Sequence, residues 1–173
     1  MRSSVLKSGP VLERRGFWRP DFSRRGLIRL VLVAVVAAGW FGLVCRPAII
    51  NGGSMMPTYP ALGFNFCWKP VFWFSHPHRG QVVIARYLGE DVMLLKRVVA
   101  LAGDTVEFRE GKLLVNGVPV KEPYVKSGCN WDLPLRRIDE GCVYLVGDNR
   151  GMPIEQHKFG EISGKRVIGV PLW

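Results

Sequence analysis

The sequence is short of the residue types that metal-binding and redox domains need. It has four cysteines and three histidines in 173 residues, and no two cysteines form a CxxC pair. His76 and His78 have a spacing that a metal site could use, but Pro77 separates them and Arg79-Gly80 follows, a composition typical of an exposed turn. We therefore expect no metal and no organic cofactor.

Acidic residues are also few, yet the basic excess that results is concentrated at one end. The net charge is +10, of which +7 belongs to residues 1–46 and +3 to the remaining 127 residues. A nucleic-acid-binding domain needs its basic residues on the folded body. We therefore expect no nucleic-acid partner, and interpret residues 1–26 as a polar, arginine-rich arm that can contact anionic lipid.

Only one long apolar run interrupts the chain. Residues 27–45 read LIRLVLVAVVAAGWFGLVC, with Arg29 as their one charge. As a helix they would extend about 28 Å, close to the roughly 30 Å hydrocarbon core of a bilayer. A cleaved secretory signal or a lipoprotein cysteine at Cys45 fits less well, because the run is long and lacks small residues before a cleavage site. We predict an uncleaved anchor, with residues 1–26 in the cytoplasm and residues 46–173 on the opposite side.

Helical periodicity, internal repeats and low-complexity tracts are missing after the anchor. Glu110-Gly111 and Asn116-Gly117 predict tight turns, and the second is a strong hairpin signal. Short runs bounded by Gly, Pro, Asn or Asp predict strands at 81–88, 92–101, 104–110, 112–120, 142–148 and 166–173. We predict a mostly β domain of antiparallel sheets, folded over or forming a partial barrel.

Two of the cysteines could pair if the domain lies in an oxidising compartment. Cys129 and Cys142 bracket a short loop, and closing it would stabilise the fold by roughly 3 kcal/mol. Cys67 lies in an apolar stretch and is interpreted as a core residue.

The first candidate for chemistry is the serine in NGGSMMPTYP, residues 51–60. Glycines before Ser54 allow a second chain to approach closely, and Pro57 stiffens the turn that follows. An ordinary turn has the same composition. A hydroxyl is also a weak nucleophile without a base, so the serine alone does not define a site.

Lys96 is the candidate base. It lies among apolar residues in VMLLKRVVAL, on a predicted strand whose other face carries Arg97. Burial would lower its pKa, so that a neutral amine could accept a proton. A strand lysine that extends its head group to solvent is the alternative interpretation. A histidine base would have to come from the exposed pair at 76 and 78 or from His157 in a polar tail.

Four motifs, in their order along the chain, resemble those of bacterial signal peptidase I: SMMPT (54–58), RGQVV (79–83), LLKRVVALAGD (94–104) and VGDNR (146–150). The resemblance covers about residues 46–173. It implies a monomeric, cofactor-free serine endopeptidase, anchored in the inner (cytoplasmic) membrane, that removes signal peptides on the periplasmic, extracytoplasmic side. It also implies coiled antiparallel sheets, with a cap that must be small here, at about 111–142.

The resemblance assigns roles to individual residues. Ser54 corresponds to the nucleophile and Lys96 to the general base of a Ser–Lys dyad. The residues expected to form the oxyanion site and brace the dyad are Gly52, Gly53, Asp148, Asn149 and Arg150. The expected pocket walls, which would select Ala-x-Ala-like sequences, are Ile50, Met55, Ile84, Leu94 and Leu95.

This sequence departs from the family pattern in places that bear on mechanism. Gly52 stands where some members carry a serine of the oxyanion hole, which leaves the Ser54 N–H, with Asn51 or water, for that task. Pro153 cannot supply the hydroxyl that the family has in its tail, and Glu155 is the candidate for the acid that orients the lysine.

These departures and the small cap keep a second function open. A dedicated peptidase that matures pro-pilin or another conjugation or secretion substrate would use the same chemistry as a general signal peptidase. The anchor argues against a soluble Ser–Lys autoprotease. The presence of both Ser54 and Lys96 argues against a non-catalytic, membrane-anchored β module.

Overall fold

The computed structural model describes residues 23–87 and 92–173, so most of the predicted arm and Leu88 of one predicted strand lie outside it. The α-helix α1 (Arg24–Gly39) continues as a π-helical turn, Trp40–Val44. Together they are long and apolar enough to cross a membrane. The helix predicted over 27–45 is therefore present, except that Cys45 already belongs to the first strand. The chain divides after Ala37 into two compact units, and the second contains all the strands described below.

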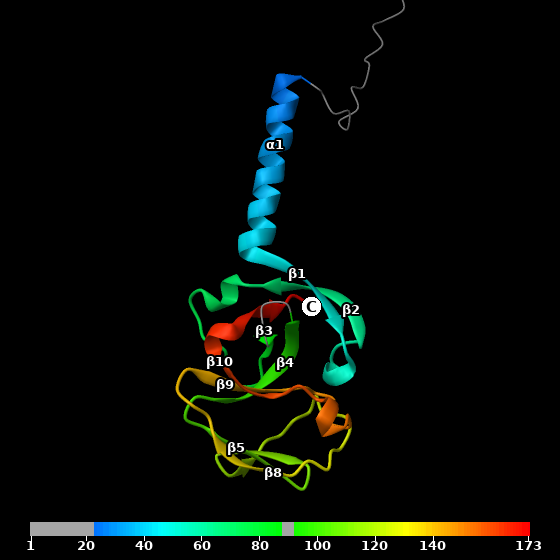
Figure 1. The fold of residues 1–173 in the computed structure, drawn as a ribbon, viewed down its shortest axis with the longest axis vertical. Coiled ribbons are helices and arrows are strands. Elements are labelled where there is room, and N and C mark those ends of the chain that lie inside the picture. The colour runs from blue at the N-terminus through cyan, green and yellow to red at the C-terminus, as the bar shows by residue number, and fades with distance from the viewer. Residues whose placement is uncertain (1–22, 88–91) are drawn as a thin grey trace, which may run out of the picture. The chain divides into compact units, whose positions relative to one another are not determined.

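The larger of two sheets has seven strands, all paired antiparallel (Figure 1). The strands in spatial order are β1 (Cys45–Asn51), β2 (Leu62–Trp68), β11 (Val167–Pro171), β3 (Val82–Tyr87), β4 (Val92–Leu101), β9 (Cys142–Val146) and β10 (Gly160–Ser163). The strand β1 forms one edge. Since β9 pairs with β4 only from Arg97 onward, the first half of β4 also has an open edge in the part of the chain that the structure describes.

The smaller sheet has four strands and forms the cap. The strands in spatial order are β7 (Val118–Pro119), β6 (Lys112–Val115), β5 (Thr105–Arg109) and β8 (Leu133–Arg137). The cap therefore includes β5, which precedes the start predicted at 111. Two-residue turns join β5 to β6 and β6 to β7, and both residues of each turn, at 110–111 and 116–117, have positive φ angles. The two predicted tight turns are thus confirmed, since such angles match the twist of a hairpin.

The main core lies between the two sheets. Val99 of β4 and Val146 of β9 pack with Phe108 of β5 and Leu113 of β6, and the Trp131 ring lies tilted against Phe108, with the ring centres 5.3 Å apart. A second cluster joins Val98 of β4 and Leu145 of β9 to residues of β3 and β11, among them Val83 and Val167. The mostly β, antiparallel fold predicted from the sequence is confirmed. After residue 44, helical structure among the described residues is limited to single 3₁₀ turns: Gly53–Met55, Pro70–Phe72, Ile154–Gln156 and Gly164–Arg166.

The candidate disulfide between Cys129 and Cys142 is absent from this structure, in which all four cysteines are free thiols. The Cys129 Sγ donates a hydrogen bond of 3.0 Å to the Gly111 carbonyl, at the turn between β5 and β6. Cys142 begins β9 in the other sheet, where burial and the neighbouring Glu161 raise the pKa of its thiol. Cys67 is fully buried, as expected of a core residue.

Candidate active site

Ser54 lies in the 3₁₀ turn that follows β1. Gly52 enters this turn with a φ angle of 135°, a conformation that favours glycine, and its N–H donates to the Ala61 carbonyl at 2.8 Å. Met55, only 2% exposed, fixes the far side of the turn in the protein interior. Ser54 is half-buried rather than fully exposed, so its hydroxyl is held within the domain surface.

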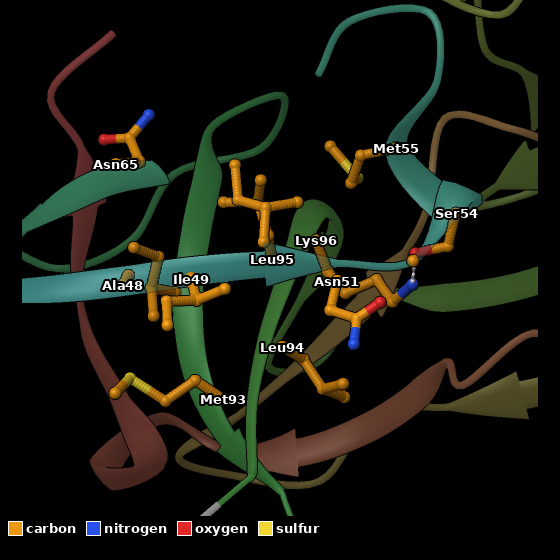
Figure 2. Close-up of a pocket in the computed structure, with 13 residues that line it drawn as sticks. Ala48, Ile49, Asn51, Ser54, Met55, Asn65, Met93, Leu94, Leu95 and Lys96 are labelled. Atoms are coloured by element: carbon orange, nitrogen blue, oxygen red, sulfur yellow. Dashed lines mark hydrogen bonds between the residues drawn. The ribbon is translucent and has the colours of Figure 1, made fainter. Parts of the chain in front are cut away.

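Lys96 lies on β4, and its side chain reaches the serine. Its Nζ and the Ser54 Oγ are hydrogen-bonded, as Figure 2 shows. Lys96 is only 2% exposed. Burial lowers its pKa from 10.5 to about 8, because an ammonium loses its hydration there. Asp148 opposes this shift and Lys158 adds to it. The amine is therefore uncharged in a useful fraction of molecules just below pH 8.

An apolar cleft leads away from the Ser54–Lys96 pair. Its walls come from β1 and from the first half of β4, and Figure 2 shows both strands beside the pair. The cleft holds about 530 Å³, part of it open to solvent. All five residues expected from the sequence to line a pocket do line it: Ile50, Met55, Ile84, Leu94 and Leu95. Asn51 and Gly52 also lie on its wall.

The loop at 147–150, which follows β9, holds the serine turn from behind. The Asn149 backbone N–H donates to the Ser54 carbonyl at 3.0 Å, and the Asn149 Nδ2 donates to the Gly53 carbonyl at 2.9 Å. Gly147 lies so close that a methyl group there would collide with the Ser54 carbonyl oxygen. The 147–150 loop and the serine turn thus form one hydrogen-bonded unit.

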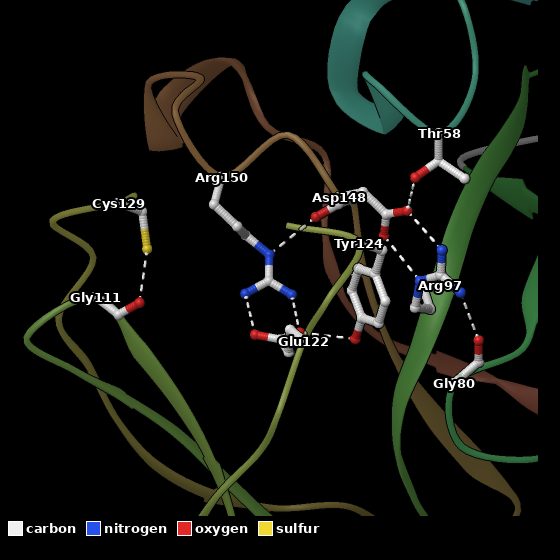
Figure 3. A network of polar contacts seen from close by, with 10 residues as sticks. Thr58, Gly80, Arg97, Gly111, Glu122, Tyr124, Cys129, Asp148 and Arg150 are labelled. Atoms are coloured by element: carbon white, nitrogen blue, oxygen red, sulfur yellow. Dashed lines mark hydrogen bonds and ion pairs between the residues drawn. The ribbon is translucent and has the colours of Figure 1, made fainter. Parts of the chain in front are cut away.

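Asp148 ties the same loop to β4. Its carboxylate accepts two hydrogen bonds from Arg97, of 2.9 and 2.6 Å, and one of 2.6 Å from the Thr58 hydroxyl. Arg97 also donates to the Gly80 carbonyl at 2.7 Å. Since Arg97 is adjacent to Lys96 on β4, this pairing fixes the strand that carries the amine. Figure 3 shows these contacts together.

Arg150 connects the loop to the cap through contacts that sequence reasoning missed. Its guanidinium is 2% exposed and bonds both oxygens of Glu122, at 2.9 and 2.5 Å. The Tyr124 hydroxyl donates to the same carboxylate at 2.8 Å, and its ring lies 3.8 Å below the Arg97 guanidinium (Figure 3). The segment KEPYV, residues 121–125, gave no signal of this role, because it looks like an ordinary polar connection.

Two expectations about the tail require correction. Glu155 does not orient the lysine: it is exposed, and Asp148 is the carboxylate whose charge acts on Lys96. His157 is not in a polar, exposed position but is 4% exposed, with its ring against Trp131. His76 and His78 are exposed, as expected of a turn.

Comparison with known proteins gives a consistent result. The family model for "Signal peptidase, peptidase S26" matches residues 24–172. A probable signal peptidase I-1 from Synechocystis sp. is 30% identical over 155 residues, which are 84% of this chain and 79% of the relative. A signal peptidase I from Bacillus licheniformis is 29% identical over 154 residues, or 82% and 83% of the two chains. A crystal structure of a signal peptidase I from Enterococcus faecalis matches with a TM-score of 0.46 at 25% identity, over 56% of this chain and 97% of that one.

The class of protein is therefore a peptidase with an apolar N-terminal helix. The chain belongs to the signal peptidase S26 family, because the family model covers nearly its whole length.

Proposed function

We propose that this protein is a membrane-anchored serine endopeptidase that cleaves signal peptides from exported precursors through a Ser54–Lys96 dyad. The observation that carries the proposal is a buried lysine, with a pKa lowered to about 8, hydrogen-bonded to a serine at the end of an apolar cleft. The chain's relatives are named signal peptidases, which supports the substrate class.

The chemistry is acyl transfer. Uncharged Lys96 takes the Ser54 proton, and the Oγ attacks the scissile carbonyl carbon to form a tetrahedral intermediate. The Ser54 N–H stabilises its oxyanion, together with Asn51, which lies on the cleft wall. The C–N bond then breaks as the Lys96 ammonium protonates the leaving amine. Water, deprotonated by Lys96, finally hydrolyses the acyl-enzyme and restores both side chains.

The substrate binds as an extended strand. The edge strand β1 and residues 93–96 of β4 each have an edge that pairs with no other described strand, and both line the cleft. A peptide placed between them can form backbone hydrogen bonds along its length while alternate side chains enter the apolar wall. The helix at Arg24–Val44 tethers the domain to the extracytoplasmic surface of the cytoplasmic membrane, where the apolar segment of a signal peptide lies.

The test is cleavage of a signal-peptide-bearing precursor by the full chain in detergent. Ser54→Ala and Lys96→Met should each abolish cleavage, with a loss of at least about a thousandfold, because both act in the same covalent step. The matched controls are Ser75→Ala and Lys165→Met, which change exposed residues and should cleave at the rate of the unmodified protein. Cleavage by Lys96→Met at the control rate would exclude lysine as the base.

The same assay compares two substrate classes. A general signal peptidase should cleave several unrelated precursors with an Ala-x-Ala-like sequence before the bond. If only a pro-pilin were cleaved, by the same two residues, the protein would be a dedicated peptidase of conjugation or secretion.

A further inference from the structure

His157 is a buried polar side chain that the proposed mechanism does not use. It is 4% exposed and lies within an aromatic group: its ring centre is 4.8 Å from that of Trp131 and 6.0 Å from that of Phe159. Both neighbours pack in the core between the two sheets. The ring is therefore held in one place by the cap and by the chain that leads into β10.

Neither nitrogen of this ring has a hydrogen-bond partner among the described residues. The backbone of Asn149 is close enough to favour the charged ring slightly, yet no hydrogen bond of good geometry forms. An unpaired buried nitrogen costs free energy of folding, which an apolar residue of similar shape would avoid. A histidine at this position therefore needs a hydrogen-bond partner that the folded chain alone does not provide.

The ring lies close to the backbone of the turn that carries Ser54. A methyl group on Gly147 would be 2.6 Å from the imidazole Cε1 and 2.8 Å from Nε2, and it would also meet the Ser54 carbonyl oxygen. One glycine thus separates the imidazole edge from the serine backbone. The charge of Lys96 acts on the ring as well. The imidazole is not among the residues that line the cleft.

The surroundings keep the imidazole uncharged. Burial is the main cause that lowers its pKa to about 4, and the positive charges of Lys96 and Arg150 act in the same direction. A neutral imidazole always has one nitrogen that accepts a hydrogen bond. It thus stays an acceptor throughout the pH range in which Lys96 changes its charge.

We propose that His157 is a positioning residue of the dyad, whose uncharged imidazole accepts a hydrogen bond from the Lys96 ammonium through one ordered water. This inference rests on the proposed function of Lys96 as base. When Lys96 takes the serine proton it carries three N–H groups, and the Ser54 Oγ is the one hydrogen-bond acceptor found for it among the described residues. The acceptor behind Gly147 stabilises and orients this ammonium until it protonates the leaving amine.

The test compares full-chain His157→Leu and His157→Gln in detergent, measuring kcat, KM and the pH dependence of kcat/KM. His157→Leu removes the acceptor, so kcat should fall about tenfold with KM within about twofold. Because the ammonium loses a partner, the apparent pKa of the acid limb should move to lower pH, by roughly half a unit. His157→Gln keeps an acceptor oxygen and should recover most of both changes.

Phe159→Leu is the matched control, since it alters packing in the same aromatic group without touching an acceptor, and its acid limb should stay in place. A shift of the acid limb of the pH profile to higher pH in His157→Leu would mean that water has entered the space left by the imidazole, and it would overturn the inference. An unchanged kcat would overturn it as well. If His157→Leu shows no cooperative unfolding transition, His157→Phe replaces it under the same criteria. Full activity of His157→Leu alongside inactive Lys96→Met would refute this inference alone, whereas active Lys96→Met would refute the dyad.

Discussion

The two sides of the Ser54–Lys96 pair are built differently. On the cleft side the walls are mostly aliphatic, two strand edges have no pairing partner within residues 23–87 and 92–173, and the space is open. On the rear side, the 147–150 loop makes charge-assisted hydrogen bonds to β4 and to the cap through Asp148 and Arg150. The cleft side is suited to accept a peptide backbone, and the rear side is suited to hold the reacting groups still.

The two sides therefore have different tasks: the cleft side binds the peptide, and the rear side positions the reacting groups. A peptide strand that adds to an open edge gains affinity from its backbone bonds and needs few fixed partners. A general base, in contrast, must stay within hydrogen-bond reach of the proton that it takes. Changes on the rear side should therefore reduce kcat and stability, and should have little effect on KM.

The largest effect on stability should come from Arg150→Leu. It leaves the Glu122 carboxylate, whose side chain is 10% exposed, without its bidentate partner, and should cost about 3–5 kcal/mol of the free energy of unfolding. The measurement is denaturant unfolding of the full chain in detergent. Arg136→Leu is the control: its ion pair with Glu161 spans 3.5 Å and its side chain is 61% exposed, so its loss should cost below about 1 kcal/mol. Equal losses in the two variants would contradict the view that the rear side is the rigid one.

The next largest effect should come from Gly147→Ala. The added methyl group would push the Ser54 carbonyl and the His157 ring apart. A displacement of the serine by about 1 Å should reduce kcat about a hundredfold, with little change in KM. Gly128→Ala is the matched control, since a methyl group there meets nothing within 4 Å. A KM increase without loss of kcat would instead place Gly147 on the binding side.

The pH dependence should follow Lys96. Its pKa of about 8 means that kcat/KM should rise about tenfold per pH unit below that value and level off above it. The folded state also binds fewer protons than the unfolded state between about pH 8 and 10.5, so the contribution of Lys96 to the free energy of unfolding should increase with pH in that window. Initial rates from pH 5.5 to 9.5 would check the first statement. A bell-shaped profile centred near pH 6 would point to a histidine base instead.

The smallest effect should come from Thr58→Val. Asp148 would lose one hydrogen bond of 2.6 Å but keep both bonds from Arg97, so the cost should be about 1 kcal/mol or less. We expect a loss of kcat of no more than about fivefold, and a KM that does not change, measured on the precursor. If only KM changed, Thr58 would act on substrate binding in the cleft and not on the positions of the reacting groups.

Most of the strands could be predicted because their signals are local. The turns at 110–111 and 116–117 and the alternation in β4 each depend on a few adjacent residues. The strands β1, β2, β8 and β10 were missed for identifiable reasons. For example, β2 carries the buried Asn65, which bonds the Leu172 N–H at 3.0 Å and so breaks the apolar alternation, and β8 contains Pro134 and is mostly exposed.

The candidate site was only partly predictable. The serine turn and the lysine strand were visible as motifs, and the structure brings their side chains together across 42 positions of sequence. The partners of Arg150 and the burial of His157 were not visible. They depend on Glu122 and Trp131, which reach the site only because the cap folds against β9.

The sequence by itself determined the apolar helix, the antiparallel β character and the pair of residues proposed for catalysis. Each of these depends on periodicity, turn residues or short motifs, which involve only residues close together in the sequence. The tertiary structure alone decided which cysteines stay apart, which carboxylate acts on Lys96 and where the third histidine lies. These depend on burial and on contacts between distant segments, and both are set by how the two sheets pack together.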